Sequence, residues 1–228
     1  HGLNAIEFGD IGELYITIGG NTNAGIPGQL SGSQKQKETL LSAAIVVARL
    51  ADPDFDGTLK YDAADDGNLV GGKGVEVFAA GLRNPFGIMM HTNGKLYASD
   101  NGLNFGYGDI SLGCNGERRA DTEEEDKIVL VEKGKYYGHA NHKRGKTDPR
   151  QCVWHSVSDP SNGDYTAPLI EIKSSSGGLT EFRSNHFGGQ LRGNLISSQY
   201  LGSLYRVILT PDGKGVEPSS DPAIPLGD

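Results

Sequence analysis

The fold is decided by the stretch Arg83-Asn84-Pro85-Phe86-Gly87-Ile88 and by the two segments that follow it, Lys95–Gly102 (KLYASDNG) and Glu125–Gly138 (EDKIVLVEKGKYYG). An Arg-Asn-Pro turn leads into an apolar strand. A second strand ends in an acidic loop with glycine, and a third leads to Gly-x-Tyr-Tyr-Gly. This order places an arginine, an asparagine and several loop carbonyls at the ends of neighbouring strands. Sites for small ligands and ions are commonly built from such loops on a rigid scaffold.

Short hairpins recur along the chain. Ala5–Phe8 and Leu14–Ile18 flank a turn that contains glycine, and their alternation predicts two paired strands. Gly87–Met90 and Lys95–Ala98 flank Asn93-Gly94, a strong hairpin signal. The remaining predicted strands are Ile45–Leu50, Gly57–Tyr61, Val75–Phe78, Lys127–Glu132, Leu169–Ile172, Asn194–Ser197 and Ser203–Leu209.

One window, Gln34–Ala43, has helical character, with a loop of one turn as the alternative. The low-complexity stretches Ala63–Asn68 and Ser174–Gly178 are predicted to be loops. A Leu-Tyr pair recurs in three hairpins at irregular spacing, which is typical of an irregular β-propeller rather than a solenoid. The strands suffice for three to four blades of ~40–50 residues each. We therefore predict an all-β chain in which residues 1–228 form one incomplete propeller domain, with further blades before residue 1 and after residue 228.

The composition narrows the choice of function. The 228 residues suit one or two domains, and 34 glycines without a period indicate many turns. A net charge of −8 argues against nucleic-acid binding, because such a surface repels phosphate. The longest apolar run, Ala43–Ala48, has the length of a strand and falls short of the ~18–20 residues of a membrane span.

The two cysteines, Cys114 and Cys152, lie in polar, loop-like surroundings. A disulfide between them would suit an exported protein, whereas two free thiols would suit a cytosolic one. We favour the disulfide and a secreted protein, because both cysteines flank a long insertion that a crosslink would tether. No signal peptide is apparent, and the chain starts with His1 rather than Met.

In this order and spacing, the motifs of the chain resemble the soluble quinoprotein glucose/sorbosone dehydrogenase family, and within it the fungal-type pyranose dehydrogenases. The resemblance runs from His1 to about Asp212. It implies a six-bladed β-propeller that uses pyrroloquinoline quinone (PQQ) and Ca²⁺ to oxidise a pyranose sugar at the anomeric carbon. Hydride passes to the quinone, and electrons pass on to an external acceptor such as a cytochrome domain or protein. The motifs that carry the resemblance are His1-x-x-x-x-Ile6-x-Phe8-Gly9, Leu14–Gly19, Gly81–Gly87, Asn101-Gly102, Glu125–Ile128, Gly134–Gly138 and Gly202–Arg206.

The resemblance also assigns roles to individual residues. His1 aligns with the catalytic base, a task that suits an imidazole with an ordinary pKa near 6.5. Arg83 and Asn84 align with residues that contact PQQ, where a guanidinium can hold a carboxylate and polarise a quinone carbonyl. Asn101 sits beside the loop in which the carbonyls of Gly102 and Leu103 align with ligands of Ca²⁺. Arg83 is thus both a cofactor-binding and a catalytic candidate.

Two further arginines, Arg183 and Arg206, lie where the family places basic residues around the cofactor, although the alignment of Arg183 is loose. Each candidate also has a purely structural interpretation. His1 can be a frayed terminus, Arg83 a surface residue of an Asn-Pro turn, and Arg206 an exposed strand charge.

The chain departs from the bacterial relatives at two positions. Gly20 stands where they have an aspartate that orients the base, and Leu201 stands where they have a basic residue. A cofactor with three carboxylates needs positive charge nearby, so these departures support a second hypothesis, a propeller module that has lost the cofactor and its activity. A third hypothesis is a copper oxidase in which His1 forms an N-terminal histidine brace.

Overall fold

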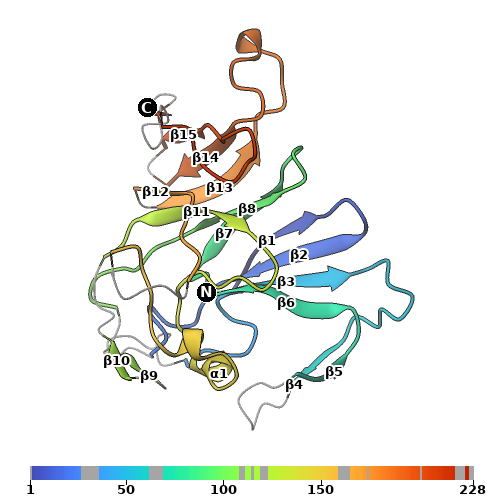
Figure 1. Ribbon diagram of the computed structural model, residues 1–228, viewed down its shortest axis with the longest axis vertical. Coiled ribbons are helices and arrows are strands. Elements are labelled where there is room, and N and C mark those ends of the chain that lie inside the picture. The colour runs from blue at the N-terminus through green and yellow to red at the C-terminus, as the bar shows by residue number, and fades with distance from the viewer. Residues whose placement is uncertain are drawn as a thin grey trace.

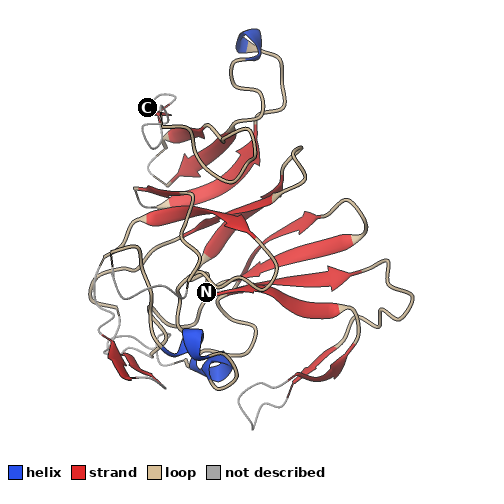
Figure 2. Ribbon diagram, in the orientation of Figure 1, coloured by secondary structure: helices blue, strands red, loops and turns tan. Residues whose placement is uncertain are grey.

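The computed structural model describes residues 2–26, 36–61, 69–107, 111–113, 116–118, 123–158, 165–173, 175–200, 202–218 and 224–225. These residues form mainly strands, arranged as three four-stranded antiparallel sheets that fan out from a shared centre (Figure 1, Figure 2). The first strand of the second sheet, β7, packs against the first strands of the other two, β1 and β13. The prediction of an all-β part of a propeller is therefore confirmed, with three blades in the described part of the chain.

Each blade is a meander in which sequence order follows spatial order. The first blade contains β1 (Leu3–Phe8), β2 (Glu13–Ile18), β3 (Ala44–Arg49) and β6 (Val75–Ala80). The second contains β7 (Pro85–Met90), β8 (Leu96–Asp100), β11 (Asp126–Val131) and β12 (Ile170–Ile172). The third contains β13 (Ser176–Glu181), β14 (Leu195–Gln199), β15 (Leu204–Val207) and β16 (Ile224–Pro225).

Smaller elements lie in the connections between these strands. Two separate hairpins are formed by β4 (Leu59–Tyr61) with β5 (Leu69–Gly72) and by β9 (Ser111–Gly113) with β10 (Gly116–Arg118). The helices are α1 (His142–Gly145) and the 3₁₀ turns η2 (Pro149–Cys152) and η3 (Phe187–Gly189). None of the helices in the described ranges is long and apolar enough to cross a membrane.

Two hydrophobic clusters fill the spaces between the blades. Apolar side chains of the first and second blades meet in one cluster, and those of the second and third meet in the other. Strand β3 is buried along almost its whole length, which explains why its sequence, Ala44-Ile45-Val46-Val47-Ala48, is continuously apolar. The least exposed side chains of the two clusters are Ile45, Val47, Leu82, Ala98, Tyr97, Ile128, Leu195 and Val207.

Most predicted strands are found, but one local prediction was wrong. Of the two alternatives for Gln34–Ala43, the described part forms the loop, in which the Ser42 hydroxyl binds both the N–H and the carbonyl of Thr39. The stretch Ser174–Gly178, predicted as a loop, contains the start of β13. The other predicted loop, residues 63–68, lies outside the described residues.

Small residues that face the start of β13, Gly87 of β7 and Ser99 of β8, have a packing role. A Cβ atom on Gly87 of β7 would lie 2.8 Å from the Leu179 backbone nitrogen and 3.1 Å from the Gly177 carbonyl oxygen. The Ser99 hydroxyl also donates to that carbonyl at 2.8 Å. The innermost strands are thus so close that small residues are required where they face each other.

The structure describes only one of the two cysteines of the predicted disulfide. Cys152 is fully buried at the end of η2, whereas Cys114 lies outside the described residues. The crosslink therefore stays a prediction.

Candidate functional site

The three innermost strands begin at the same end of the molecule, and this end holds the site. Asn4 near the start of β1 donates through its side-chain amide to the side chain of Asn84, directly before β7, at 2.9 Å. The amide of Asn101, directly after β8, donates to the carbonyl of Ser176 at the start of β13, at 2.8 Å. The chain therefore brings residues from all three blades together here.

Asp100, the last residue of β8, fixes the turn that carries Arg83 and Asn84. Its carboxylate accepts the backbone N–H of Asn84 at 2.7 Å and that of Arg83 at 3.2 Å. Complete burial raises the pKa of Asp100 to about 6, although the charges of Lys127 and Arg83 and the two backbone bonds act in the opposite direction. The two predicted residues therefore have a fixed backbone and a titratable group beneath it.

The Arg83 side chain is only 4 % exposed. Its Nε–H donates to the Asn23 carbonyl at 3.2 Å, and Nη2 donates to the Asn23 side chain at 3.0 Å. Burial lowers the pKa of Arg83, while the charges of nearby carboxylates, first of all Asp100 and Asp126, oppose that shift. Among the described residues, these bonds use two of the five guanidinium N–H groups, so the others remain for a ligand.

Amide side chains connect the predicted residues into one network. Asn84 donates to the side-chain oxygen of Asn101 at 2.8 Å, and Asn101 donates to Asp126 at 2.7 Å. Asp126 also accepts the backbone N–H of Gly102 at 2.9 Å. Arg83, Asn84, Asn101 and the following loop are thus placed together, as the sequence predicted.

The loop at Gly102 and Leu103 is tightly packed. A Cβ atom on Gly102 would collide with the carbonyl oxygens of Glu124 and Glu125, so glycine is required. The Leu103 carbonyl accepts the N–H of Glu124 at 3.1 Å, and its side chain is buried beside Trp154. No group of three or more His, Cys, Asp or Glu side chains in the described ranges could hold a metal ion. The carbonyls of Gly102 and Leu103 stay the predicted ligands of a cation.

A buried pair, Glu38 and His139, lies beside this network and was missed by sequence reasoning. The Glu38 carboxylate accepts the backbone N–H groups of Asn21 and Thr22 at 3.1 and 3.0 Å and pairs with His139 Nε2 at 2.9 Å. The hydroxyls of Thr22 and Ser42 also donate to it. Burial alone would raise the pKa of Glu38, but the bonds from His139 and the two hydroxyls outweigh it and lower the pKa to about 2.

The pair occupies the space next to Gly20. A Cβ atom on Gly20 would lie 3.0 Å from His139 Nε2 and 3.1 Å from both the Arg83 carbonyl oxygen and a Glu38 carboxylate oxygen. The N–H of Gly20 donates to that same Arg83 carbonyl at 2.6 Å. A carboxylate is therefore present beside the Arg83 backbone, although it comes from position 38 rather than position 20. In the sequence, lysines and a threonine flank Glu38, a pattern typical of the exposed face of a helix. The sequence therefore did not indicate that Glu38 is buried beside the site.

His139 completes the pair as a neutral imidazole. Burial lowers its pKa, and Nε2–H donates to the ionised Glu38. Its other ring nitrogen, Nδ1, is buried and has no hydrogen-bond partner among the described groups. The ring packs edge-on against Trp154, with the ring centroids 5.2 Å apart.

Three predicted site residues remain, of which the structure describes two. His1 lies outside the described residues, although the carbonyl of the adjacent Gly2 accepts the N–H of Gly19 at this end of β1. Arg183 follows β13 at its far end, where it donates to Glu181 at 3.0 Å and to the Met90 carbonyl at 3.0 Å.

Arg206 likewise points away from the site. Its guanidinium binds the Asn194 side chain and the Gln190 carbonyl, both in the loop that joins β13 to β14 at the far end of the third blade. The prediction that Arg183 and Arg206 surround one cofactor together with Arg83 was therefore wrong. They bind groups at the opposite ends of the strands.

The family of the chain is now established by comparison. The model of the glucose/sorbosone dehydrogenase family matches residues 1–219, so the chain belongs to that family. A search of curated proteins gave no match.

Solved structures show the same fold. A glucose dehydrogenase-type oxidoreductase of Thermus thermophilus is 23 % identical, with 92 % of this chain and 50 % of that chain covered and a TM-score of 0.53. The apo soluble aldose sugar dehydrogenase of Escherichia coli is 18 % identical, with 93 % and 52 % covered and a TM-score of 0.53. The PQQ-bound aldose sugar dehydrogenase of Streptomyces coelicolor is 17 % identical, with 94 % and 48 % covered and a TM-score of 0.52. The chain thus spans about half the length of these structures.

Proposed function

We propose that the protein is a PQQ- and Ca²⁺-dependent dehydrogenase that oxidises a pyranose sugar at its anomeric carbon. The observation that carries the proposal is the network at one end of the blades, in which Arg83, Asn84, Asn101 and Gly102 come together. Family membership supplies the reaction class, and a structure of the same fold from Streptomyces coelicolor is described as PQQ-bound.

The residues present fit an acidic quinone. Arg83 is held by Asn23 and Asp100 with guanidinium N–H groups left over, so it can donate to a carboxylate or quinone oxygen without moving. Burial strengthens such a bond, because water competes less for the donor. Asn84 and Asn101 orient each other and the adjacent backbone.

The residues also fit a hard cation. Asp100 and Asp126 lie close enough to Arg83 to act on its charge, so the site carries negative as well as positive charge. The carbonyls of Gly102 and Leu103 would hold a divalent cation, which would supply positive charge between these carboxylates and an acidic ligand. The Leu103 carbonyl keeps a second lone pair in addition to the one used by Glu124.

When bound, PQQ supplies the quinone carbon that accepts the hydride from the sugar. His1, as base, takes the proton of the anomeric hydroxyl. Arg83 holds and polarises the acceptor, while the Glu38–His139 pair maintains a fixed negative charge beside the Arg83 backbone. An external acceptor then takes up the electrons. We also propose that the protein works outside the cell.

Reconstitution tests the proposal. Purified protein is mixed with PQQ and CaCl₂, and reduction of a redox dye is followed with a panel of aldoses and ketoses. We expect sugar-dependent reduction that chelation of Ca²⁺ abolishes and that Arg83→Lys lowers by about tenfold or more, because lysine lacks the planar fork. Arg206→Lys, at the far end of the third blade, is the matched control and keeps the activity. Absence of reduction with every sugar would contradict the proposal.

A non-catalytic module is the alternative, and one observation favours it. With Arg183 and Arg206 at the far end, fewer described cations than expected remain near Arg83 for a tri-acid. Titration of PQQ while its absorbance is recorded separates the two cases. A saturable spectral shift supports the enzyme, whereas an unchanged spectrum at high protein concentration supports the module.

A further inference from the structure

Asn23 lies between two parts of the candidate site that are far apart in the sequence. Its backbone carbonyl accepts the Nε–H of Arg83 at 3.2 Å, and its side-chain oxygen Oδ1 accepts Nη2–H of the same arginine at 3.0 Å. The same Oδ1 accepts the backbone N–H of Asn104 at 3.1 Å, and the side-chain Nδ2 donates to the Asn104 carbonyl at 2.9 Å. One asparagine thus holds both the guanidinium and the residue that follows Leu103.

These partners explain why residue 23 is an asparagine. Two donors, from Arg83 and Asn104, meet at Oδ1, and a carbonyl oxygen faces Nδ2, so each end of the amide has the partner that its chemistry requires. Aspartate would place a second oxygen against the Asn104 carbonyl and would neutralise Arg83. Asn23 and Arg83 are each 4 % exposed, so water competes little for these bonds.

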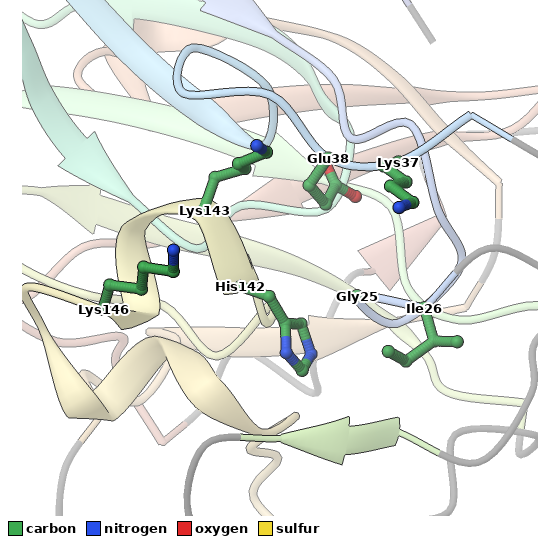
Figure 3. A pocket seen from close by; sticks show the side chains of 7 residues that line it. All are labelled: Gly25, Ile26, Lys37, Glu38, His142, Lys143 and Lys146. Atoms are coloured by element: carbon green, nitrogen blue, oxygen red, sulfur yellow. The ribbon is translucent and has the colours of Figure 1, made fainter. Parts of the chain in front are cut away.

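The loop that carries Asn23 is itself fixed on both sides of this residue. The backbone N–H of Thr22 donates to Glu38 at 3.0 Å. Gly25 has a φ of +98°, and a Cβ atom there would lie 2.6 Å from the Ala140 Cβ, so only glycine fits. Gly25 and Glu38 lie together in the lining of one pocket (Figure 3). The amide of Asn23 is therefore presented from a rigid segment of the chain.

Apolar packing joins the same two loops. Ala24, the next residue, and Leu103 are both 1 % exposed, and they belong to one buried cluster with Trp154. Hydrogen bonds from Asn23 and packing of its neighbour thus fasten one loop to the other at adjacent positions.

We propose that Asn23 is a positioning residue, which sets the direction of the Arg83 guanidinium relative to the segment Leu103-Asn104. The Leu103 carbonyl is a predicted cation ligand, and it lies directly before the residue that Asn23 binds. A shift of Asn23 would therefore change the placement of both the guanidinium and this carbonyl. That these groups hold an acidic quinone and a cation rests on the proposed function, whereas the positioning itself rests only on the contacts of Asn23.

NMR spectroscopy of the isotope-labelled chain without PQQ, Ca²⁺ or sugar tests the positioning. We expect Asn23→Ala to accelerate amide proton exchange at Asn104 by about tenfold or more, which corresponds to the loss of about one hydrogen bond. The Nη signals of Arg83 are separate while the guanidinium is held and should merge once it rotates. Exchange at Val47, in the buried strand β3, measures global stability, and a merely structural role would accelerate both amides equally.

Asn194→Ala is the matched control. Asn194 is also buried, and its side-chain oxygen accepts the Nε–H of Arg206 at the far end of the third blade. This variant should leave the signals of Asn104 and Arg83 unchanged. In an absorbance titration with PQQ in the presence of CaCl₂, Asn23→Ala should bind PQQ about tenfold or more weakly, and Asn194→Ala should bind it as the unaltered protein does.

Asn23→Asp provides the test if Asn23→Ala does not fold. Its carboxylate still accepts from Arg83, so the Nη signals should stay separate, but its charge neutralises Arg83 and should weaken PQQ binding. The inference is overturned if Asn23→Ala accelerates exchange at Asn104 no more than at Val47, or if Asn194→Ala has the same effect. It is also overturned if Asn23→Asp releases the Nη signals or binds PQQ as tightly as the unaltered protein. An unaltered protein that binds no PQQ contradicts the proposed function instead, and the NMR data then decide on Asn23 alone.

Discussion

At the scale of single residues, Asp100 couples the charge of the site to pH. Its folded pKa of about 6 lies above the ordinary 3.8, so its protonation favours the folded protein, and that contribution disappears as pH rises through about 6. Below that pH the group is neutral and no longer compensates Arg83. A larger share of the Arg83 charge then remains for an anionic ligand.

We therefore predict that PQQ binds several-fold more tightly at pH 5 than at pH 7.5, as measured by absorbance titration. Asp100→Asn should bind at pH 7.5 as the unaltered protein does at pH 5 and should show little further dependence on pH. A variant with the same pH dependence as the unaltered protein would assign the effect to another group.

Glu38 has the opposite linkage. Its folded pKa of about 2 lies below the ordinary 4.5, so it stabilises the protein above pH 4.5, and this contribution is lost as pH falls towards 2. We predict that Glu38→Gln lowers the free energy of unfolding at pH 7 by about 3 kcal/mol, because it removes the charged partner of several buried donors. Urea unfolding measures the change.

The exposed Glu132 offers a control for this experiment. Glu132→Gln should change the free energy of unfolding by less than about 0.5 kcal/mol. Equal unfolding midpoints for Glu38→Gln and the unaltered protein would show that the buried carboxylate is dispensable for stability.

These residues also show what the sequence could predict about the site. Arg83, Asn84 and Asn101 flank strands that pair with each other, so local order along the chain was enough to bring them together. Arg206 was misplaced because position on a strand does not reveal which end of the blade a long side chain reaches. Glu38 and His139 are far apart in sequence, and only the packing of two loops makes them a pair.

At the scale of elements, the contact between β7 and β13 limits the size of side chains. We predict that Gly87→Ala destabilises the protein by about 1–3 kcal/mol, since the added methyl group would meet the β13 backbone and the Ser99 hydroxyl. Denaturant unfolding measures the loss. Gly178→Ala on β13 is the matched control, because a Cβ atom there finds only the Ser198 hydroxyl at 3.7 Å. Equal losses for the two variants would contradict this explanation.

The same contact explains why the hairpins were predicted from the sequence whereas strand β13 was not. Hairpins with apolar alternation and an Asn-Gly turn were recognised, because their signals are local. Strand β13 begins with Ser176-Gly177-Gly178, a composition that by itself indicates a loop. Its strand conformation comes from neighbours in the ring, and these are not visible in its own sequence.

At the scale of the whole molecule, the two faces of the first blade differ. On one face, Glu7 of β1 accepts the N–H of Met90 in the second blade at 2.8 Å, and Ala5 packs against the cluster between these blades. The other face is a cross-strand apolar patch. It is formed by the register pairs Leu3–Ile18, Ile6–Ile16 and Phe8–Leu14.

The β1 side chains of this patch are open to solvent. Leu3, Ile6 and Phe8 are 73 %, 61 % and 62 % exposed, and an exposed apolar sheet face of this kind drives association. We expect the chain to self-associate reversibly as its concentration rises, as measured by sedimentation velocity. Ile6→Lys should weaken that association, because it places a charge in the centre of the patch. Ile11→Lys changes an isoleucine that is 79 % exposed in the β1–β2 turn and should leave association unchanged. A monomer at all concentrations, or the same effect from both variants, would show that this face is not what brings copies together.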